Sequence, residues 1–244
     1  MKIIDSKEEA VKELNRISSR TNSEKNEKIN AIVEEILQEV KNFGDIAVEK
    51  FTKKFDGFNP SPMQVSTELI KNAWDEIDSN LKHSLEVAYK RIKKFHEQEI
   101  PESFSIKGEH GDIVQRRWRP VKNAGIYIPG GRAAYPSTVL MNAIPAKVAG
   151  VEEIIMVSPG NKEGEINKTV LAAAHLSGIN KVFRIGGAQA IGALAFGTNQ
   201  INKVDVISGP GNIYVTTAKK LIYGSTGIDS LAGPSEILII ADET

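Results

Sequence analysis

Four glycine-rich turns carry the residues of this chain that could bind a ligand. They lie at 127–138 (YIPGGRAAYPST), 186–189 (GGAQ), 209–212 (GPGN) and 233–236 (GPSE). Glycines after a strand let the backbone approach a ligand closely, and a helix that begins directly after the turn favours an anion. Any single turn could be only a tight turn that needs a positive φ angle. Four such turns at one edge of one sheet favour a shared cleft, of the kind that binds nucleotide phosphates.

The turns do not have the G-x-G-x-x-G spacing of dinucleotide-binding proteins. The glycines of FRIGGAQAIG (183–192) depart from it, and in GPGNIY (209–214) a tyrosine replaces the third glycine. Asp229 lies about 20 residues further on, where a ribose-binding acid would be sought. It follows a Gly/Ser/Thr segment rather than clearly ending a strand. We therefore interpret this match as a lookalike.

The composition excludes several classes of chemistry. There is no cysteine, so disulfides, thiolate metal sites and thiol nucleophiles are excluded within this chain. No Ser-His-Asp order and no convincing carboxylate pair can be picked out. The histidines are scattered, without a metal-ligand partner at i+3 or i+4, which favours surface or structural roles. They are His83, His96, His110 and His175.

Charge and hydropathy limit the partners. The 31 basic and 31 acidic residues cancel, unlike the basic footprint of a nucleic-acid binder. No apolar run reaches the ~18 residues of a membrane helix. Acidic residues occupy the N-terminus where a signal peptide would carry its apolar stretch. We therefore expect a soluble, cytoplasmic protein that binds neither nucleic acid nor membranes.

The first half has the pattern of amphipathic helices. Residues 1–122 are rich in lysine and glutamate and poor in glycine. Apolar residues at helical spacing predict helices over 27–44, 45–57, 66–77 and 79–101. The apolar sides of these helices include Ile46, Phe55 and Phe95. Residues 112–121 (DIVQRRWRPV) alternate apolar and polar side chains, which predicts a half-buried strand.

The second half alternates short apolar runs with helical segments. Most of the 20 glycines lie between 125 and 233, in the turns that join these segments. One helix is predicted within 137–150, with Ser137 or Thr138 as its cap, and a last buried strand within 236–242. A repeated strand–helix alternation is typical of a mostly parallel, doubly wound sheet of the α/β class. Ligands bind such sheets at the carboxyl ends of the strands, where the glycine turns lie.

Taken together, these segments resemble the histidinol dehydrogenase family. Order and spacing match, and the helical first half with its FDG at 55–57 fits the family's N-terminal region. The resemblance covers essentially the whole chain. The segments that carry it are RWRPVKNAGIYIPGG (117–131), STVLMN (137–142), GGAQAIGALAFGT (186–198), VDVISGPGN (204–212) and AGPSEILIIAD (232–242).

The resemblance implies a function and a set of binding residues. The family oxidises L-histidinol to L-histidine in two NAD-dependent steps through a bound aldehyde, with zinc at the active site. It implies a Rossmann-like sheet in which NAD is contacted directly by Tyr127, Gln189 and Asn212, and the substrate by Ser235. The hydroxyl of Tyr127 and the amide of Gln189 suit this role because both can donate and accept hydrogen bonds.

The same resemblance implies that parts of the enzyme lie outside these 244 residues. In the family, a Gln-x-x-His pair of zinc ligands follows the strand that here ends near 242, and the remaining ligands and a Glu-His pair come later. We therefore expect no catalytic residue and no metal ligand in this chain, which would be a truncated, inactive fragment. Residues 123–234 would form the NAD-binding domain. Residues 1–122 would belong to a first α/β domain, completed by 235–244 and by missing sequence, and the complete protein would be a homodimer.

Two alternatives stay open. The chain could belong to a related NAD-dependent dehydrogenase that acts on another amino alcohol, or on a sulfonated or sugar-like alcohol. It could also be a nucleotide-binding module without chemistry of its own, which the missing histidines favour.

Overall fold

The computed structural model describes residues 3–18, 23–130 and 134–231. The first half contains α1 (Lys7–Ser18), α2 (Ser23–Phe43), α3 (Asp45–Asp56), α4 (Thr67–Glu76), α5 (Ser79–His96), β1 (Phe104–Lys107) and β2 (Ile113–Arg116). The second half contains β3 (Asn123–Tyr127), α6 (Pro136–Ala149), β4 (Glu153–Val157), α7 (Lys168–Leu176), β5 (Lys181–Phe183), α8 (Gly187–Phe196), β6 (Val206–Ser208), α9 (Ile213–Ile222) and β7 (Gly227–Ile228).

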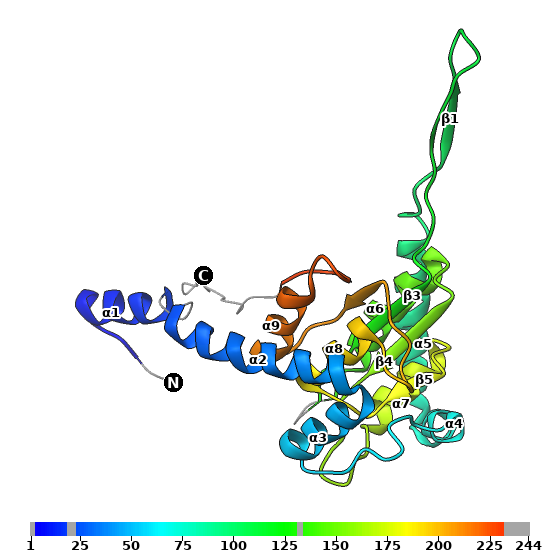
Figure 1. Cartoon of the computed structure of the whole chain (residues 1–244). Coiled ribbons are helices and arrows are strands. Elements are labelled where there is room, and N and C mark those ends of the chain that lie inside the picture. Colours follow the sequence, from blue (N-terminus) through cyan, green and yellow to red (C-terminus); the bar gives the residue numbers. More distant parts are fainter. Residues whose placement is uncertain (1–2, 19–22, 131–133, 232–244) are drawn as a thin grey trace, which may run out of the picture.

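A five-stranded parallel sheet organises the second half, in the order β5-β4-β3-β6-β7. The chain starts at β3 in the centre, moves outward through β4 and β5, and then returns to the other side of β3 with β6 and β7 (Figure 1). This reversal makes the sheet doubly wound, as predicted. It also creates a topological switch point between β3 and β6, the usual place for a ligand crevice.

Helices from both halves of the chain cover the two faces of the sheet. On one face α6 and α7 pack against α5 and α4, and on the other α8 and α9 pack against α2 and α3. Successive side chains of β3 point to opposite faces of the sheet. Ile126 packs in the hydrophobic core on the side of α6 and α7, and Tyr127 packs in the core on the side of α8 and α9. The helical first half therefore contributes to both cores of the sheet domain.

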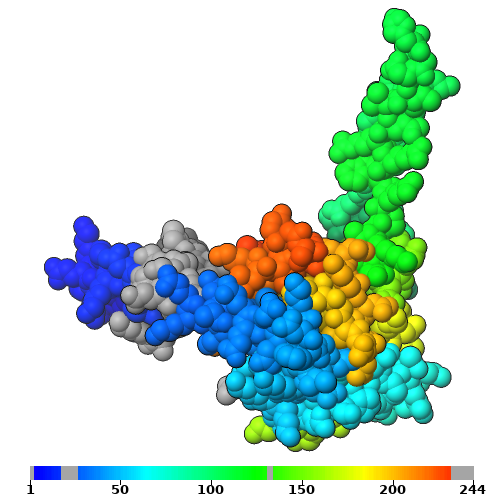
Figure 2. Space-filling view, in the orientation of Figure 1, coloured from blue at the N-terminus to red at the C-terminus, as the bar shows by residue number. Residues whose placement is uncertain are grey.

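The predicted half-buried strand at 112–121 is wrong in its extent and its burial. Only Ile113–Arg116 is a strand, and it pairs antiparallel with β1 in a two-stranded ribbon whose residues are all exposed. The ribbon projects from the body of the molecule (Figures 1 and 2). Alternation predicts a strand with an apolar side, but the described part of the chain supplies nothing that buries that side.

Some helix details also depart from the predictions. Helix α6 begins at Pro136, with Tyr135 as N-cap and without a side-chain cap, so Ser137 and Thr138 are not caps. A proline at the first helical position is already set at a helical φ angle, which places the start earlier. Three predicted apolar-side residues are exposed, namely Ile46, Phe55 and Phe95. The predicted strand at 236–242 lies outside the described residues. Among the described helices, none combines the length and apolarity needed to cross a membrane.

Candidate functional site

One pocket lies at the carboxyl edge of the sheet and contains three of the four predicted binding residues. Its volume is about 550 Å³, and Tyr127, Gln189 and Asn212 all line it. They come from the end of β3 and from the starts of α8 and α9. The first half closes the pocket with residues of α2 and α3. The fourth predicted residue, Ser235, lies outside the described residues.

Tyr127 presents a protonated hydroxyl at this pocket. It is the last residue of β3 and is buried. Its Oη accepts a hydrogen bond of 3.2 Å from the backbone N–H of Gly187, so the hydroxyl proton remains available to donate. Burial raises the pKa of Tyr127 to about 12; the Gly187 hydrogen bond opposes this rise, and the nearby charge of Asp56 adds to it. The phenol is therefore a neutral donor at physiological pH.

Gln189 has a buried amide that the described protein does not use. The residue is 1% exposed, and neither Nε2 nor Oε1 has a hydrogen-bonding partner among the described residues. Leaving such a group unpaired costs about 1–3 kcal/mol. A Cβ atom on Gly187, whose φ is +62°, would lie only 2.7 Å from Oε1 of Gln189. The glycine therefore makes room for a buried amide that lies in the pocket wall and has no partner among the described residues.

Asn212 has a structural role as well as a place in the pocket wall. It is the N-cap of α9, and its Oδ1 accepts hydrogen bonds from the N–H groups of Tyr214 (3.0 Å) and Val215 (3.1 Å). This cap fixes the side chain at the helix start, where backbone N–H groups favour an anionic ligand. This capping role of Asn212 was not predicted from the sequence.

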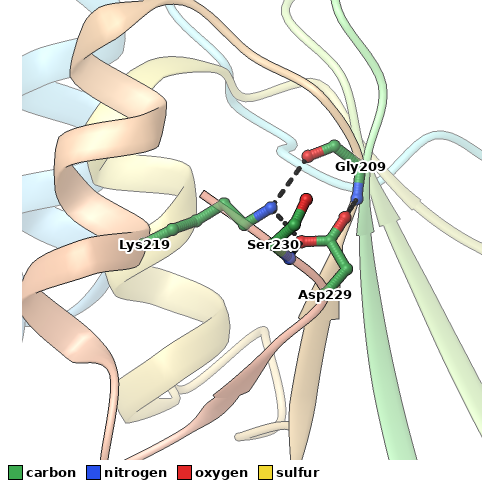
Figure 3. Close-up of polar contacts among 4 residues, drawn as sticks. All are labelled: Gly209, Lys219, Asp229 and Ser230. Atoms are coloured by element: carbon green, nitrogen blue, oxygen red, sulfur yellow. Dashed lines mark hydrogen bonds and ion pairs between the residues drawn. The ribbon is translucent and has the colours of Figure 1, made fainter. Parts of the chain in front are cut away.

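A buried lysine binds the backbone of the GPGN turn (Figure 3). Lys219 of α9 is 3% exposed; its Nζ donates to the carbonyl oxygen of Gly209 at 3.1 Å and forms an ion pair with Asp229. The Asp229 carboxylate in turn accepts a hydrogen bond of 2.8 Å from the N–H of Gly209. Asp229 therefore binds the turn itself, which agrees with its interpretation as a lookalike of a ribose-binding acid.

The histidinol dehydrogenase family model matches residues 19–244. The chain belongs to the histidinol dehydrogenase family. Histidinol dehydrogenases of Prochlorococcus marinus strain MIT 9312 and strain CCMP1986 are 88% and 81% identical to it over all 244 residues. A crystal structure of histidinol dehydrogenase from Elizabethkingia anophelis has a TM-score of 0.80 and 41% identity, covering 84% of this chain and 48% of that one. The chain spans about half the length of the curated relatives it matches, 56% of the first and 57% of the second.

Family membership confirms the resemblance and the α/β class, while the roles of the individual binding residues stay predictions. The structure brings Tyr127, Gln189 and Asn212 together, although they are far apart in the sequence. It also adds one acidic residue of the family-like FDG segment, for which the sequence analysis predicted no role. Asp56 lines the same pocket, and burial raises its pKa to about 6.

A second pocket, of about 590 Å³, adjoins the first across Pro129, Gly130 and Pro159. It lies between α4 and α7, and Arg184 is among the residues that line it. Both volumes are within the ~300–1,000 Å³ of small-molecule sites. The first pocket contains the three predicted binding residues and the amide of Gln189, both polar atoms of which lack a partner among the described residues.

For zinc, the described residues do not provide a site. Within 3–18, 23–130 and 134–231, no group of three or more His, Asp or Glu side chains is close enough to hold a metal ion. His175 lies 6.1 Å from the ring of Trp74, and His96 pairs with Glu99. The described residues therefore do not form the zinc site that the family resemblance implies.

Proposed function

We propose that this chain supplies the NAD-binding part of a histidinol dehydrogenase, an oxidoreductase that converts L-histidinol to L-histidine through the aldehyde. One observation carries the proposal. The end of β3 and the starts of α8 and α9 bring Tyr127, Gln189 and Asn212 to one pocket, where the buried amide of Gln189 has no partner among the described residues. Buried polar groups are normally hydrogen-bonded, so an unused pair of donor and acceptor favours a bound ligand.

The chemistry of the pocket suits a dinucleotide. The hydroxyl of Tyr127 donates, and the amide of Gln189 can both donate and accept. Helices α8 and α9 begin at the pocket, and helix N-termini favour phosphate groups. These residues would bind and orient NAD, which accepts the hydride in each oxidation step.

Zinc is part of the proposed activity of the whole protein, but we assign none of its ligands and no proton transfer to the described residues. In the proposal, the zinc ligands and the acid–base residues lie beyond Thr244, and Ser235 contacts the substrate. We further propose a cytoplasmic homodimer, with residues 123–234 as the NAD-binding domain and residues 1–122 as part of a first α/β domain completed by 235–244 and further sequence.

Replacing Gln189 by leucine is expected to weaken NAD binding at least tenfold without loss of folding stability. The leucine removes the hydrogen bonds offered to NAD, and a lost hydrogen bond of this kind is worth about 1.4 kcal/mol or more, which is tenfold in affinity. The unliganded fold loses nothing, because the amide is unpaired there. Isothermal titration calorimetry with NAD and thermal unfolding would measure the two effects.

Gln200→Leu is the matched control, since Gln200 is exposed and does not line the pocket. It should leave NAD affinity within about twofold, because surface substitutions usually change energies by less than 0.5 kcal/mol. If Gln189→Leu bound NAD as tightly as the unaltered chain, the nucleotide would not occupy this pocket.

A further inference from the structure

We propose that Asp56 binds the hydroxyl groups of the adenosine ribose of NAD and sets the preference for NAD over its 2′-phosphorylated form. The inference rests on the proposed NAD site and deepens it. Nothing in the sequence motifs points to this role, since Asp56 comes from the helical first half rather than from a strand end of the sheet.

The position of Asp56 is not explained by the fold. It is the last residue of α3, and Gly57, with a φ of +80°, ends the helix. A negative charge at a helix C-terminus is disfavoured by the helix dipole, so the carboxylate contributes nothing to capping. It lies instead in the wall of the pocket, close enough to Tyr127 for its charge to affect that hydroxyl.

One carboxylate oxygen of Asp56 is buried without a donor. Its Oδ2 has no hydrogen-bonding partner within the part of the chain that the structure describes. Desolvation raises the pKa of this carboxyl to about 6, because burial disfavours its charged form. An unpaired buried acceptor opposes folding, so a partner supplied by a ligand is the simplest reason for its presence.

The charges around the pocket narrow the identity of that ligand group. Lys54 and Glu35 also line the pocket and are exposed, whereas Asp56 is half-buried, with its Oδ2 fully buried. A carboxylate accepts hydrogen bonds from two neighbouring hydroxyl groups, as the vicinal hydroxyls of a ribose offer. A 2′-phosphate brings negative charge and removes one donor. The carboxylate therefore binds the ribose hydroxyls of NAD and repels the 2′-phosphate of the phosphorylated form.

The test compares Asp56→Asn with Glu34→Gln, which removes an exposed carboxylate of α2 that does not line the pocket. The ligands are NAD, its 2′-phosphorylated form, and an NAD analogue that lacks the adenosine 2′-hydroxyl. Asp56→Asn is expected to weaken NAD binding about tenfold, because hydrogen bonds to charged groups are the stronger ones. It should narrow the preference for NAD over the phosphorylated form and change the affinity for the deoxy analogue much less. Glu34→Gln should leave all three affinities within about twofold.

Two results would overturn the inference while the NAD site stands. One is unchanged NAD affinity in Asp56→Asn when Gln189→Leu weakens binding, and the other is an equal loss for NAD and the deoxy analogue. Thermal unfolding guards against a folding defect, since removal of an unpaired buried charge should not lower the melting temperature. If the unaltered chain bound none of the three ligands, the proposed NAD site itself would fall, and the inference with it.

Discussion

Replacing Gly209 by alanine is expected to destabilise the fold by about 3–5 kcal/mol and to abolish NAD binding. The new Cβ would lie 2.1 Å from the carbonyl oxygen of Tyr127, and the φ of Gly209 is +113°. Neither the GPGN turn nor the end of β3 can move easily to relieve this clash. Tyr127 ends the central strand, and the N–H of Gly209 is bonded to Asp229. Urea unfolding followed by tryptophan fluorescence would measure the loss, and calorimetry the binding.

The variant Gly224→Ala measures the cost of the backbone strain alone, without the steric clash expected in Gly209→Ala. Gly224 has a similar φ of +100°, but a Cβ there would meet no described atom within 4 Å. The alanine should therefore cost only the strain of a left-handed backbone, about 1–2 kcal/mol. The difference between the two variants measures the close approach of the GPGN turn to β3. Equal losses in both would mean that Gly209 is required only for its backbone conformation.

The sheet could be predicted because its sequence signals are local. The apolar runs that form β3, β4, β5 and β6 are each followed by a glycine-containing turn and then by one of the helices α6, α7, α8 and α9. This alternation fixes parallel pairing, since parallel strands need a crossover connection. The order of the strands follows from the doubly wound pattern, in which the first strand takes the centre.

Burial in the helical first half was harder to predict, because periodicity shows that a helix has an apolar side without showing what covers that side. Val48 and Phe51 of α3 are buried against the sheet helices, whereas Ile46 and Phe55 of the same helix are exposed. The same limit applies to the ribbon of β1 and β2. The strand pattern of β2 was visible, but neither β1 nor the absence of a covering layer in the described chain was.

The candidate site divides in the same way. Tyr127, Gln189 and Asn212 were predicted from the family resemblance, whose motifs stand next to recognisable turns, and the structure places all three in one pocket. Asp56 stands in the FDG segment that resembles the family, but its place in the pocket wall could not be predicted, because the pocket joins segments about 70 or more residues apart. Lys219 illustrates the limit most clearly. It stands beside Lys220 in α9, and only tertiary packing buries the first and exposes the second.

Replacing Lys219 by methionine is expected to destabilise the fold by about 3 kcal/mol, the lower end of the cost of breaking a buried ion pair. The lower end applies because the side chain of Asp229 is 35% exposed while that of Lys219 is 4% exposed. Methionine keeps much of the length and apolar packing of lysine but leaves Asp229 and the carbonyl of Gly209 without their charged partner. Chemical unfolding would measure the change.

Lys220→Met on the same turn of helix is the control and should change stability by less than about 0.5 kcal/mol. A double-mutant cycle with Asp229→Asn should show coupling between Lys219 and Asp229, since the two side chains share one ion pair. NAD affinity adds a second readout. The lysine holds the turn that leads to Asn212, so Lys219→Met should weaken binding although Lys219 does not line the pocket. Loss of stability with unchanged NAD affinity would show that the pair supports the fold without positioning the site.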